Sequence, residues 1–237
     1  MAIRKIVFDM EGTILGHELE EIHFEAFRLA AAAVGVFFDP DNIVADMASK
    51  IPNAIGGGDR TNCEGIWRLS SRQTSVEEIM RLKKSLYGDM VERLESIAPR
   101  PGFLEVFEAI RRLGLKVAIA SLTPRNQAEV LLERSGVGKL FKGHPVLLED
   151  FGGKAKPAPD VYLEAARRLG IRPDEQFVFE DSPSGVKAAH AAGSPVIAMP
   201  IFTFPENLAK LREAGALKIF FSWEEVNIVQ LLRELNS

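Results

Sequence analysis

The sequence predicts an α/β protein: a doubly wound parallel sheet into which an all-helical domain is inserted. Two observations support this fold class. Short apolar runs alternate with helical patterns along most of the 237 residues, which is typical of a parallel sheet covered by helices. From about residue 16 to residue 97, long helical patterns occur without a convincing strand, so this segment interrupts the alternation.

Each expected strand is a short apolar run that ends at polar or turn-forming residues. In chain order the runs are Ile3–Phe8, Lys116–Ala120, a weaker one near Pro145–Leu148, Gln176–Phe179, Pro195–Met199 and Lys218–Phe221. Helices are expected between the strands, and several of their starts can be recognised. Proline is favoured in the first turn of a helix. Such starts occur at Thr123-Pro124, Ser182-Pro183 and Phe204-Pro205, and Ser222 with Glu225 has capping-box spacing.

The inserted segment is predicted to hold three or four helices. Residues 18–34 show helical periodicity, and Ser75 followed by Glu78 has the capping-box spacing that opens another long helix. Three aromatic residues of this segment are expected in its core, with a ring-stacking platform for substrate as the alternative; they are Phe37, Phe38 and Trp67.

Glycine and proline mark the two ends of the insertion, near residues 12–16 and 99–102. We therefore expect an α/β core formed by residues 1–15 and 98–237, and a helical domain formed by residues 16–97. The two boundary stretches are candidate hinges that let the helical domain close over a site and exclude water.

Composition indicates an ordinary soluble globular protein. Hydrophobic residues make up 46% and charged residues 26%, and the formal net charge is -4. No basic excess favours nucleic acid as a partner, and no apolar stretch approaches the ~20 residues that span a bilayer. The single cysteine, Cys63, cannot form an internal disulfide. We therefore expect a cytoplasmic protein without membrane partners. A monomer or weak dimer is the expected assembly, although no pattern in the sequence specifies it.

Carboxylates follow two of the expected strands. Asp9 and Glu11 come directly after the first strand, and Glu180 and Asp181 follow the strand that ends at Phe179. Side chains two apart on an extended segment share a face, so Asp9 and Glu11 can address one substrate, one as nucleophile and the other as proton donor. Taken singly, each pair is also consistent with an ordinary polar strand exit or a helix cap.

Ser121 and Thr123 follow the strand that ends at Ala120, and Pro124 then opens a helix. Hydroxyls and free amides at a helix N-terminus suit a phosphate oxygen, although either residue could instead be a helix cap. Lys156 lies in a loop rich in glycine and proline, which leaves it fewer conformations to lose when it binds a phosphate. The alternative is an ordinary solvated lysine.

Together these strand ends indicate one site, because the carboxyl ends of parallel strands form the ligand crevice. Two carboxylates ~4 Å apart repel by about 4 kcal/mol at a protein-like dielectric, so the cluster needs a cation. Hard oxygen ligands without nearby histidine or cysteine favour Mg2+. The predicted metal-binding residues are Asp9, Glu11, Glu180 and Asp181, and Lys156 would add positive charge for a phosphoryl group.

These motifs resemble those of the haloacid dehalogenase superfamily, in the same order and over nearly the whole chain. The matching residues are Asp9-Met10-Glu11-Gly12-Thr13, Ser121, Lys156 and Glu180-Asp181. Lys156-Pro157-Ala158-Pro159-Asp160 and the segment 179–185 are similar to the β-phosphoglucomutase-like branch, which carries a helical cap where the insertion lies here. The resemblance implies a Rossmann-like core and a Mg2+-dependent enzyme.

The resemblance also implies roles for these residues. Asp9 would form an aspartyl-phosphate, and Ser121 and Lys156 would hold the phosphoryl oxygens. Mg2+ would be bound by Asp9, Asp181 and the backbone carbonyl of Glu11, with Glu180 joining directly or through water. Glu11 would protonate the leaving alcohol and then activate water.

Glu11 departs from the pattern of the branch, which normally has aspartate at this position. Glutamate keeps a titratable carboxylate and reaches about 1.5 Å further, the length of one carbon–carbon bond. A carboxylate here argues against dehalogenation, because dehalogenases of the superfamily carry an aromatic residue at this position. A non-catalytic protein that kept the fold is the alternative.

Two residues of the insertion are candidate substrate contacts. His23 resembles a histidine that positions substrate in the mutase, and a partly buried structural histidine is the alternative. Arg60 follows three glycines where the branch has its substrate-specificity loop, and it could bind a second anionic group or be solvated. With Thr123, these are the predicted substrate-binding residues.

The leading hypothesis is a phosphatase that hydrolyses small-molecule phosphate esters, with sugar or polyol phosphates as the substrate class. A phosphomutase that returns the phosphoryl group to a bound sugar is the second hypothesis, motivated by His23 and Arg60. A non-enzymatic binding protein is the third, motivated by Glu11.

Overall fold

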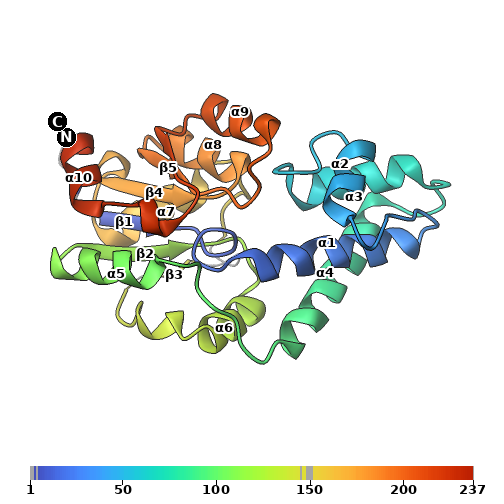
Figure 1. Cartoon of the computed structure of the whole chain (residues 1–237), viewed down its shortest axis with the longest axis horizontal. Helices are drawn as coiled ribbons and strands as arrows, with labels where there is room; N and C mark the ends of the chain where they lie inside the picture. The colour runs from blue at the N-terminus through green and yellow to red at the C-terminus, as the bar shows by residue number, and fades with distance from the viewer. Residues whose placement is uncertain (1–2, 4, 145, 148–151, 237) are drawn as a thin grey trace. The chain divides into compact units, whose positions relative to one another are not determined.

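The computed structural model describes residues 3, 5–144, 146–147 and 152–236. The chain divides into two compact units, one formed by Met1–His17 with Ser96–Ser237 and the other by Glu18–Glu95. Figure 1 colours both along the chain. Among the described residues, no helix is long and apolar enough to cross a membrane.

A six-stranded parallel sheet forms the centre of the first unit, counted over its described residues. The strands are β1 (Lys5–Phe8), β2 (Lys116–Ala120), β3 (Val146–Leu147), β4 (Gln176–Glu180), β5 (Val196–Ala198) and β6 (Lys218–Ile219). Their order is β3-β2-β1-β4-β5-β6. Phe8, the last residue of β1, lies between Ile119 of β2 and Phe179 of β4. The segments that follow β1, β2 and β4 therefore leave the sheet side by side.

Helices cover both faces of this sheet, because successive side chains of a strand point to opposite faces. Val7, Ala118 and Val178 pack in a buried cluster with residues of α7 and α8. The ring of Phe8 points the other way and meets Phe103 and Trp223, with ring centroids 5.7 and 5.8 Å apart. Figure 1 shows α8 and α9 on one side of the strands and α5 on the other. The predicted doubly wound fold is confirmed.

The helices of the first unit mostly begin where the sequence predicts. They are α5 (Phe103–Arg112), α6 (Arg125–Arg134), α7 (Asp160–Leu169), α8 (Pro183–Ala191), α9 (Pro205–Glu213) and α10 (Ile228–Asn236), with short 3-10 turns η1 (Val137–Lys139), η3 (Pro173–Glu175) and η4 (Trp223–Glu225). Pro183 and Pro205 occupy the first turns of α8 and α9, whereas Pro124 lies just before the first residue of α6.

The expected capping box at Ser222 is wrong. The Ser222 hydroxyl accepts from the backbone N–H of Glu224, so it caps the 3-10 turn η4, and α10 begins only at Ile228. The Glu225 carboxylate accepts from the N–H of Phe221 at 3.2 Å. The spacing of serine and glutamate does not distinguish the start of an α-helix from that of a 3-10 turn, because the same residue types occur at both.

Four helices lie in the described residues of the second unit: α1 (His17–Ala32), α2 (Ile43–Lys50), α3 (Gly58–Leu69) and α4 (Val76–Arg93). The first residue of α1, His17, belongs to the first unit, because the second unit begins at Glu18. The capping box at the start of α4 is confirmed, with the Ser75 hydroxyl accepting from the N–H of Glu78 and the Glu78 carboxylate accepting from the N–H of Ser75. These reciprocal bonds satisfy two amides that would otherwise lack partners.

The aromatic residues of this unit follow the prediction only in part. Phe38 is buried, but Phe37 is 74% exposed. Both lie outside any helix or strand, where composition does not determine which neighbour faces inward. Trp67 is half-buried, and its indole N–H donates to the carbonyl of Thr74 at 2.9 Å.

Candidate active site at the strand ends

The loop after β1 is a tight turn that contains Glu11 and Gly12. The N–H groups of Ile14 and Leu15 both donate to the carbonyl of Met10 at 2.9 Å. Gly12 has a φ of +78°, which favours glycine, and a Cβ there would lie 2.4 Å from the Asp181 carboxylate. Glycine at this position therefore permits the close approach of Asp181.

Lys156 joins the first and fourth strand ends. Its Nζ donates to Asp9 Oδ1 at 2.5 Å and to Glu180 Oε1 at 2.6 Å. All three side chains are at least nine-tenths buried. Burial opposes the charge of the Lys156 ammonium, but Asp9 and Glu180 outweigh it and hold the pKa of Lys156 well above its ordinary range. The lysine therefore stays cationic.

Asp9 is less well compensated than Glu180. The pKa of the Asp9 carboxyl is raised to about 8, because burial and the nearby Glu180 carboxylate together outweigh the lowering by Lys156. Burial also raises the pKa of Glu180, but Lys156 and the hydrogen bonds to its carboxylate bring it below its ordinary value. One lysine thus does not fully compensate the ionised form of Asp9.

Glu180 is held on both carboxylate oxygens. Oε1 accepts from Lys156 and from the Tyr162 hydroxyl, the latter at 2.9 Å. Oε2 accepts from the N–H and the hydroxyl of Ser182, at 2.9 and 3.0 Å. A Cβ at Gly185 would lie 1.7 Å from Glu180 Oε1, so glycine leaves room for this carboxylate.

Glu11 connects to the second strand end. Its Oε1 accepts from the Thr123 hydroxyl, and Thr123 Oγ1 lies 2.8 Å from Ser121 Oγ. Ser121 and Thr123 are buried, and the N–H of Thr123 donates to Ser121 Oγ at 3.2 Å. The three side chains form a short hydrogen-bonded chain beside Asp9, which follows the adjacent strand.

The donor set suits a divalent cation. One oxygen each of Asp9, Glu180 and Asp181 lie within 4.8 Å of one another. Oxygen ligands of this kind and the incompletely compensated charge of ionised Asp9 fit Mg2+. Because both oxygens of Glu180 are already engaged, we infer that Asp9 and Asp181 are better placed as direct ligands. The Glu11 side chain is outside this group of three, as expected if its backbone carbonyl is the ligand.

The structure therefore brings together seven of the nine predicted site residues. These are Asp9, Glu11, Ser121, Thr123, Lys156, Glu180 and Asp181. The remaining two, His23 and Arg60, belong to the second unit, and their contact with a substrate stays a prediction.

Within the second unit, His23 and Arg60 have different surroundings. Lys83 Nζ lies 2.7 Å from His23 Nδ1 and donates to Asp59 Oδ1 at 2.8 Å, although Lys83 is only 1% exposed. The imidazole of His23 stacks on Tyr87, with ring centroids 4.0 Å apart. Arg60 is exposed and lies close to the carboxylates of Glu64 and Glu77.

Sequence reasoning missed Tyr162 and Arg100. A tyrosine on the buried face of a helix signals a hydroxyl that needs a partner, so Tyr162 could have been noticed. The Arg100 guanidinium donates to carbonyls of three loops, including that of Gly12 at 2.6 Å. Its place between Pro99 and Pro101 gives no hint of these partners.

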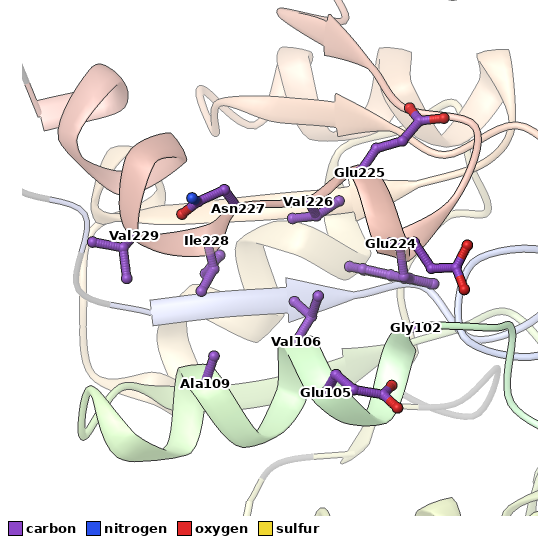
Figure 2. Close-up of a pocket in the computed structure, with 11 residues that line it drawn as sticks. Gly102, Glu105, Val106, Ala109, Glu224, Glu225, Val226, Asn227, Ile228 and Val229 are labelled. Atoms are coloured by element: carbon purple, nitrogen blue, oxygen red, sulfur yellow. The ribbon is translucent and has the colours of Figure 1, made fainter.

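A surface pocket of about 560 Å³ lies elsewhere on the first unit, between α5 and the segment from η4 to α10. Figure 2 shows Val106 and Ala109 of α5 facing Val226 and Ile228 across it. The described residues that line it include none of the seven strand-end residues. The pocket lining includes Glu105, Glu224, Glu225 and Asn227, but the buried lysine and the group of three carboxylates lie at the strand ends.

Comparison with known proteins finds relatives that match most of the chain. The chain is 29% identical over 226 residues to a phosphorylated carbohydrates phosphatase of Thermotoga maritima, covering 95% of this chain and 97% of that protein. It is 30% identical over 208 residues to protein CbbY of Cupriavidus necator, covering 84% and 78% of the two chains.

One solved structure with a similar fold contains a bound ligand. A crystal structure of CbbY from Rhodobacter sphaeroides in complex with xylulose-(1,5)bisphosphate superposes with a TM-score of 0.70 at 27% identity, covering 95% of this chain and 96% of that one. The family model of haloacid dehalogenase-like hydrolases matches residues 3–193. This protein belongs to the haloacid dehalogenase-like hydrolase family.

Proposed function

We propose that this hydrolase is a Mg2+-dependent phosphatase that removes phosphate from small phosphorylated carbohydrates, with Asp9 as the nucleophile. The observation that carries the proposal is the arrangement at the strand ends, where one buried lysine serves two buried carboxylates and a third carboxylate completes a metal-binding group. Such a site is suited to neutralise a phosphoryl group attacked by a carboxylate.

In the first step, a carboxylate oxygen of Asp9 attacks phosphorus and the bond from phosphorus to the ester oxygen breaks. Lys156 and Ser121 hold the equatorial phosphoryl oxygens. Glu11 gives its proton to the leaving oxygen, which departs as the alcohol. The contact between Glu11 and Thr123 holds the acid on the side of the second strand end before it reacts.

In the second step, water attacks the phosphorus of the aspartyl-phosphate. Glu11, now ionised, accepts a proton from this water, and the bond from phosphorus to Asp9 breaks. Inorganic phosphate leaves and the Asp9 carboxylate is regenerated. Glu11 thus serves as acid and then as base.

Asp9, Asp181 and the backbone carbonyl of Glu11 would hold Mg2+, and Glu180 would support them through Lys156 and Ser182. When bound, the metal supplies positive charge that offsets the repulsion between the carboxylates and the phosphoryl oxygens.

The substrate class is proposed from the named relatives. One is called a phosphatase of phosphorylated carbohydrates, and another was crystallised with a sugar bisphosphate. We propose that the helical unit serves as a cap that supplies further substrate contacts, with His23 and Arg60 as candidates. The strand-end residues are suited to a phosphoryl group and a metal and say little about the sugar, so we propose that the cap selects the sugar.

Phosphate release from p-nitrophenyl phosphate and from a panel of sugar and polyol phosphates tests the proposal. We expect Mg2+-dependent turnover in the wild type and at least a 10³-fold loss in Asp9→Asn, because the nucleophile is removed. Asp89→Asn, which changes an exposed aspartate of α4, serves as the matched control. Metal-independent turnover, or turnover that survives in Asp9→Asn, would contradict the proposal.

The same samples distinguish a phosphatase from a phosphomutase. Phosphorus NMR of sugar 1-phosphates follows both the free phosphate and any 6-phosphate isomer. We expect free phosphate without the isomer. Accumulation of the isomer would instead show that the phosphoryl group is returned to the bound sugar.

A further inference from the structure

Arg100 lies where the chain returns from the helical unit to the core, and it is hydrogen-bonded to the loop where the chain leaves. Its backbone N–H donates to the carbonyl of Ile14 at 2.7 Å. Leu15 and Pro99 form an antiparallel bridge beside it. The two linker segments therefore run together next to the loop that carries Glu11.

The guanidinium of Arg100 donates hydrogen bonds to backbone carbonyls in three separate loops. Nη1 donates to the carbonyls of Gly12, after β1, and Met199, after β5; Nη2 donates to that of Phe221, after β6, at 3.1 Å. A planar fork of fixed donors can meet three carbonyls in this way, whereas an ammonium on a flexible stem holds one point.

The position of Gly12 makes this contact relevant to the site. Gly12 adjoins Glu11, and its missing Cβ leaves space for Asp181. The Asp181 carboxylate also interacts electrostatically with the guanidinium of Arg100, a half-buried residue. A Cβ at Gly16 would lie 2.9 Å from Arg100 Cγ, so the linker itself is shaped around this side chain.

We propose that Arg100 is a positioning residue: by fixing the Gly12 carbonyl to the loops after β5 and β6, it sets the places of Glu11 and Asp181 for phosphoryl transfer. This inference rests on the proposed phosphatase function. Arg100 touches neither the nucleophile nor Lys156 in the described contacts, so it acts through the loop rather than on the phosphoryl group.

Steady-state kinetics of Arg100→Met and Arg100→Lys, at a temperature where each variant is folded, tests the proposal. Since Glu11 acts in the transition state, we expect kcat to fall by about ten- to a hundredfold with a smaller change in KM. Arg100→Lys keeps the charge but not the fork, and we expect only partial recovery. Arg111→Met, which removes an exposed arginine of α5 that pairs with Glu108, should match the wild type.

Amide hydrogen exchange gives a second measurement that does not depend on turnover. The N–H groups of Ile14 and Leu15 should exchange faster in Arg100→Met than in the wild type, because the turn that holds them loses its anchor.

The outcomes separate the two proposals. A wild type that releases no phosphate counts against the phosphatase function, while faster exchange in Arg100→Met still supports the anchoring of the loop. An active wild type with unchanged kcat and exchange in Arg100→Met overturns the role of Arg100. If Arg100→Met does not fold, wild-type kcat in Arg100→Lys overturns it equally.

Discussion

Glu180 accepts hydrogen bonds on both carboxylate oxygens and has no exposed surface. A buried charge is tolerated only when it is paired and hydrogen-bonded, and each of these donors contributes. Its orientation in turn fixes Lys156, which bonds both Glu180 and Asp9. Small changes around Glu180 should therefore reach the nucleophile through this lysine.

Removing the Tyr162 hydroxyl tests this dependence. In Tyr162→Phe, Glu180 loses one donor, and we expect the free energy of unfolding to fall by about 1.5–3 kcal/mol, the range for hydrogen bonds to charged groups. We also expect a several-fold lower kcat. Urea denaturation and steady-state assays measure the two effects. Leu163→Ala, at an exposed position next along α7, is the control; wild-type behaviour of Tyr162→Phe would show that Lys156 and Ser182 alone hold Glu180.

Gly185→Ala tests whether the Glu180 carboxylate needs the space that glycine leaves beside it. In a helix alanine is favoured over glycine by about 1 kcal/mol, so propensity alone predicts a more stable protein. The new Cβ would instead lie 1.7 Å from Glu180 Oε1. We expect lower thermal stability and strongly reduced activity. Lys187→Ala, on the exposed side of the same helix, controls for general effects on α8; a stabilised and active Gly185→Ala protein would show that Glu180 moves freely.

At the level of elements, a buried ionic cluster connects the helices of the second unit. Lys83 of α4 bonds Asp59 of α3 and lies 2.7 Å from His23 of α1. Its ammonium also lies over the rings of Phe27 and Tyr87, 4.7 and 5.0 Å from their centroids. Burial raises the pKa of Asp59, but Lys83, His23 and Lys84 outweigh it, so the net direction is downward.

The stability contributed by Asp59 should therefore depend on pH in one direction. Because its folded pKa lies below the ordinary 3.8, the contribution is fully present above pH ~4 and disappears as the pH falls through the lower, folded value. Above pH ~4 we expect Asp59→Asn to lower the free energy of unfolding by about 1–3 kcal/mol, because it leaves a buried ammonium uncompensated. Urea denaturation at pH 7, 5 and 3 measures this difference.

Two further variants sharpen the test. Adding Lys83→Met to Asp59→Asn should recover most of the loss, because the uncompensated charge is then gone. Asp46→Asn, which breaks a pair with exposed Lys50 on α2, should cost less. A difference between wild type and Asp59→Asn that stays constant down to pH 3 would be incompatible with the lowered pKa.

The sequence predicted the elements better than the contacts between them. β2 matches its apolar run residue for residue, and Ser75 caps α4 as its spacing indicated. Patterns of this kind act over a few residues. Arg100 illustrates the opposite case, since its partners lie 88, 99 and 121 positions away in the chain. The same limit explains why Tyr162, 18 positions from Glu180, was not recognised as its partner. Ser182 is only two positions away, but its place before Pro183 indicated a helix start and not a contact with Glu180.

For the whole molecule, the acidic strand-end cluster predicts a metal-dependent stability. Asp9, Glu180 and Asp181 share one small region, and Lys156 does not balance their charge. A ligand that binds only the folded state stabilises it by mass action, by about 2.7 kcal/mol at a concentration 100 times its Kd. Saturating Mg2+ should therefore raise the Tm of the wild type by several degrees over EDTA.

Asp9→Asn should raise the Tm without metal and reduce the gain from Mg2+. Without metal, the variant should unfold at a higher Tm than the wild type, since a buried carboxylate facing Glu180 is replaced by a neutral amide. With Mg2+ its gain should be smaller, since one ligand is lost. Differential scanning calorimetry in EDTA, MgCl2 and NaCl of matched ionic strength measures each effect and controls for screening. Equal gains from Mg2+ in both proteins would place the cation elsewhere and leave Asp9 without the metal that its proposed role requires.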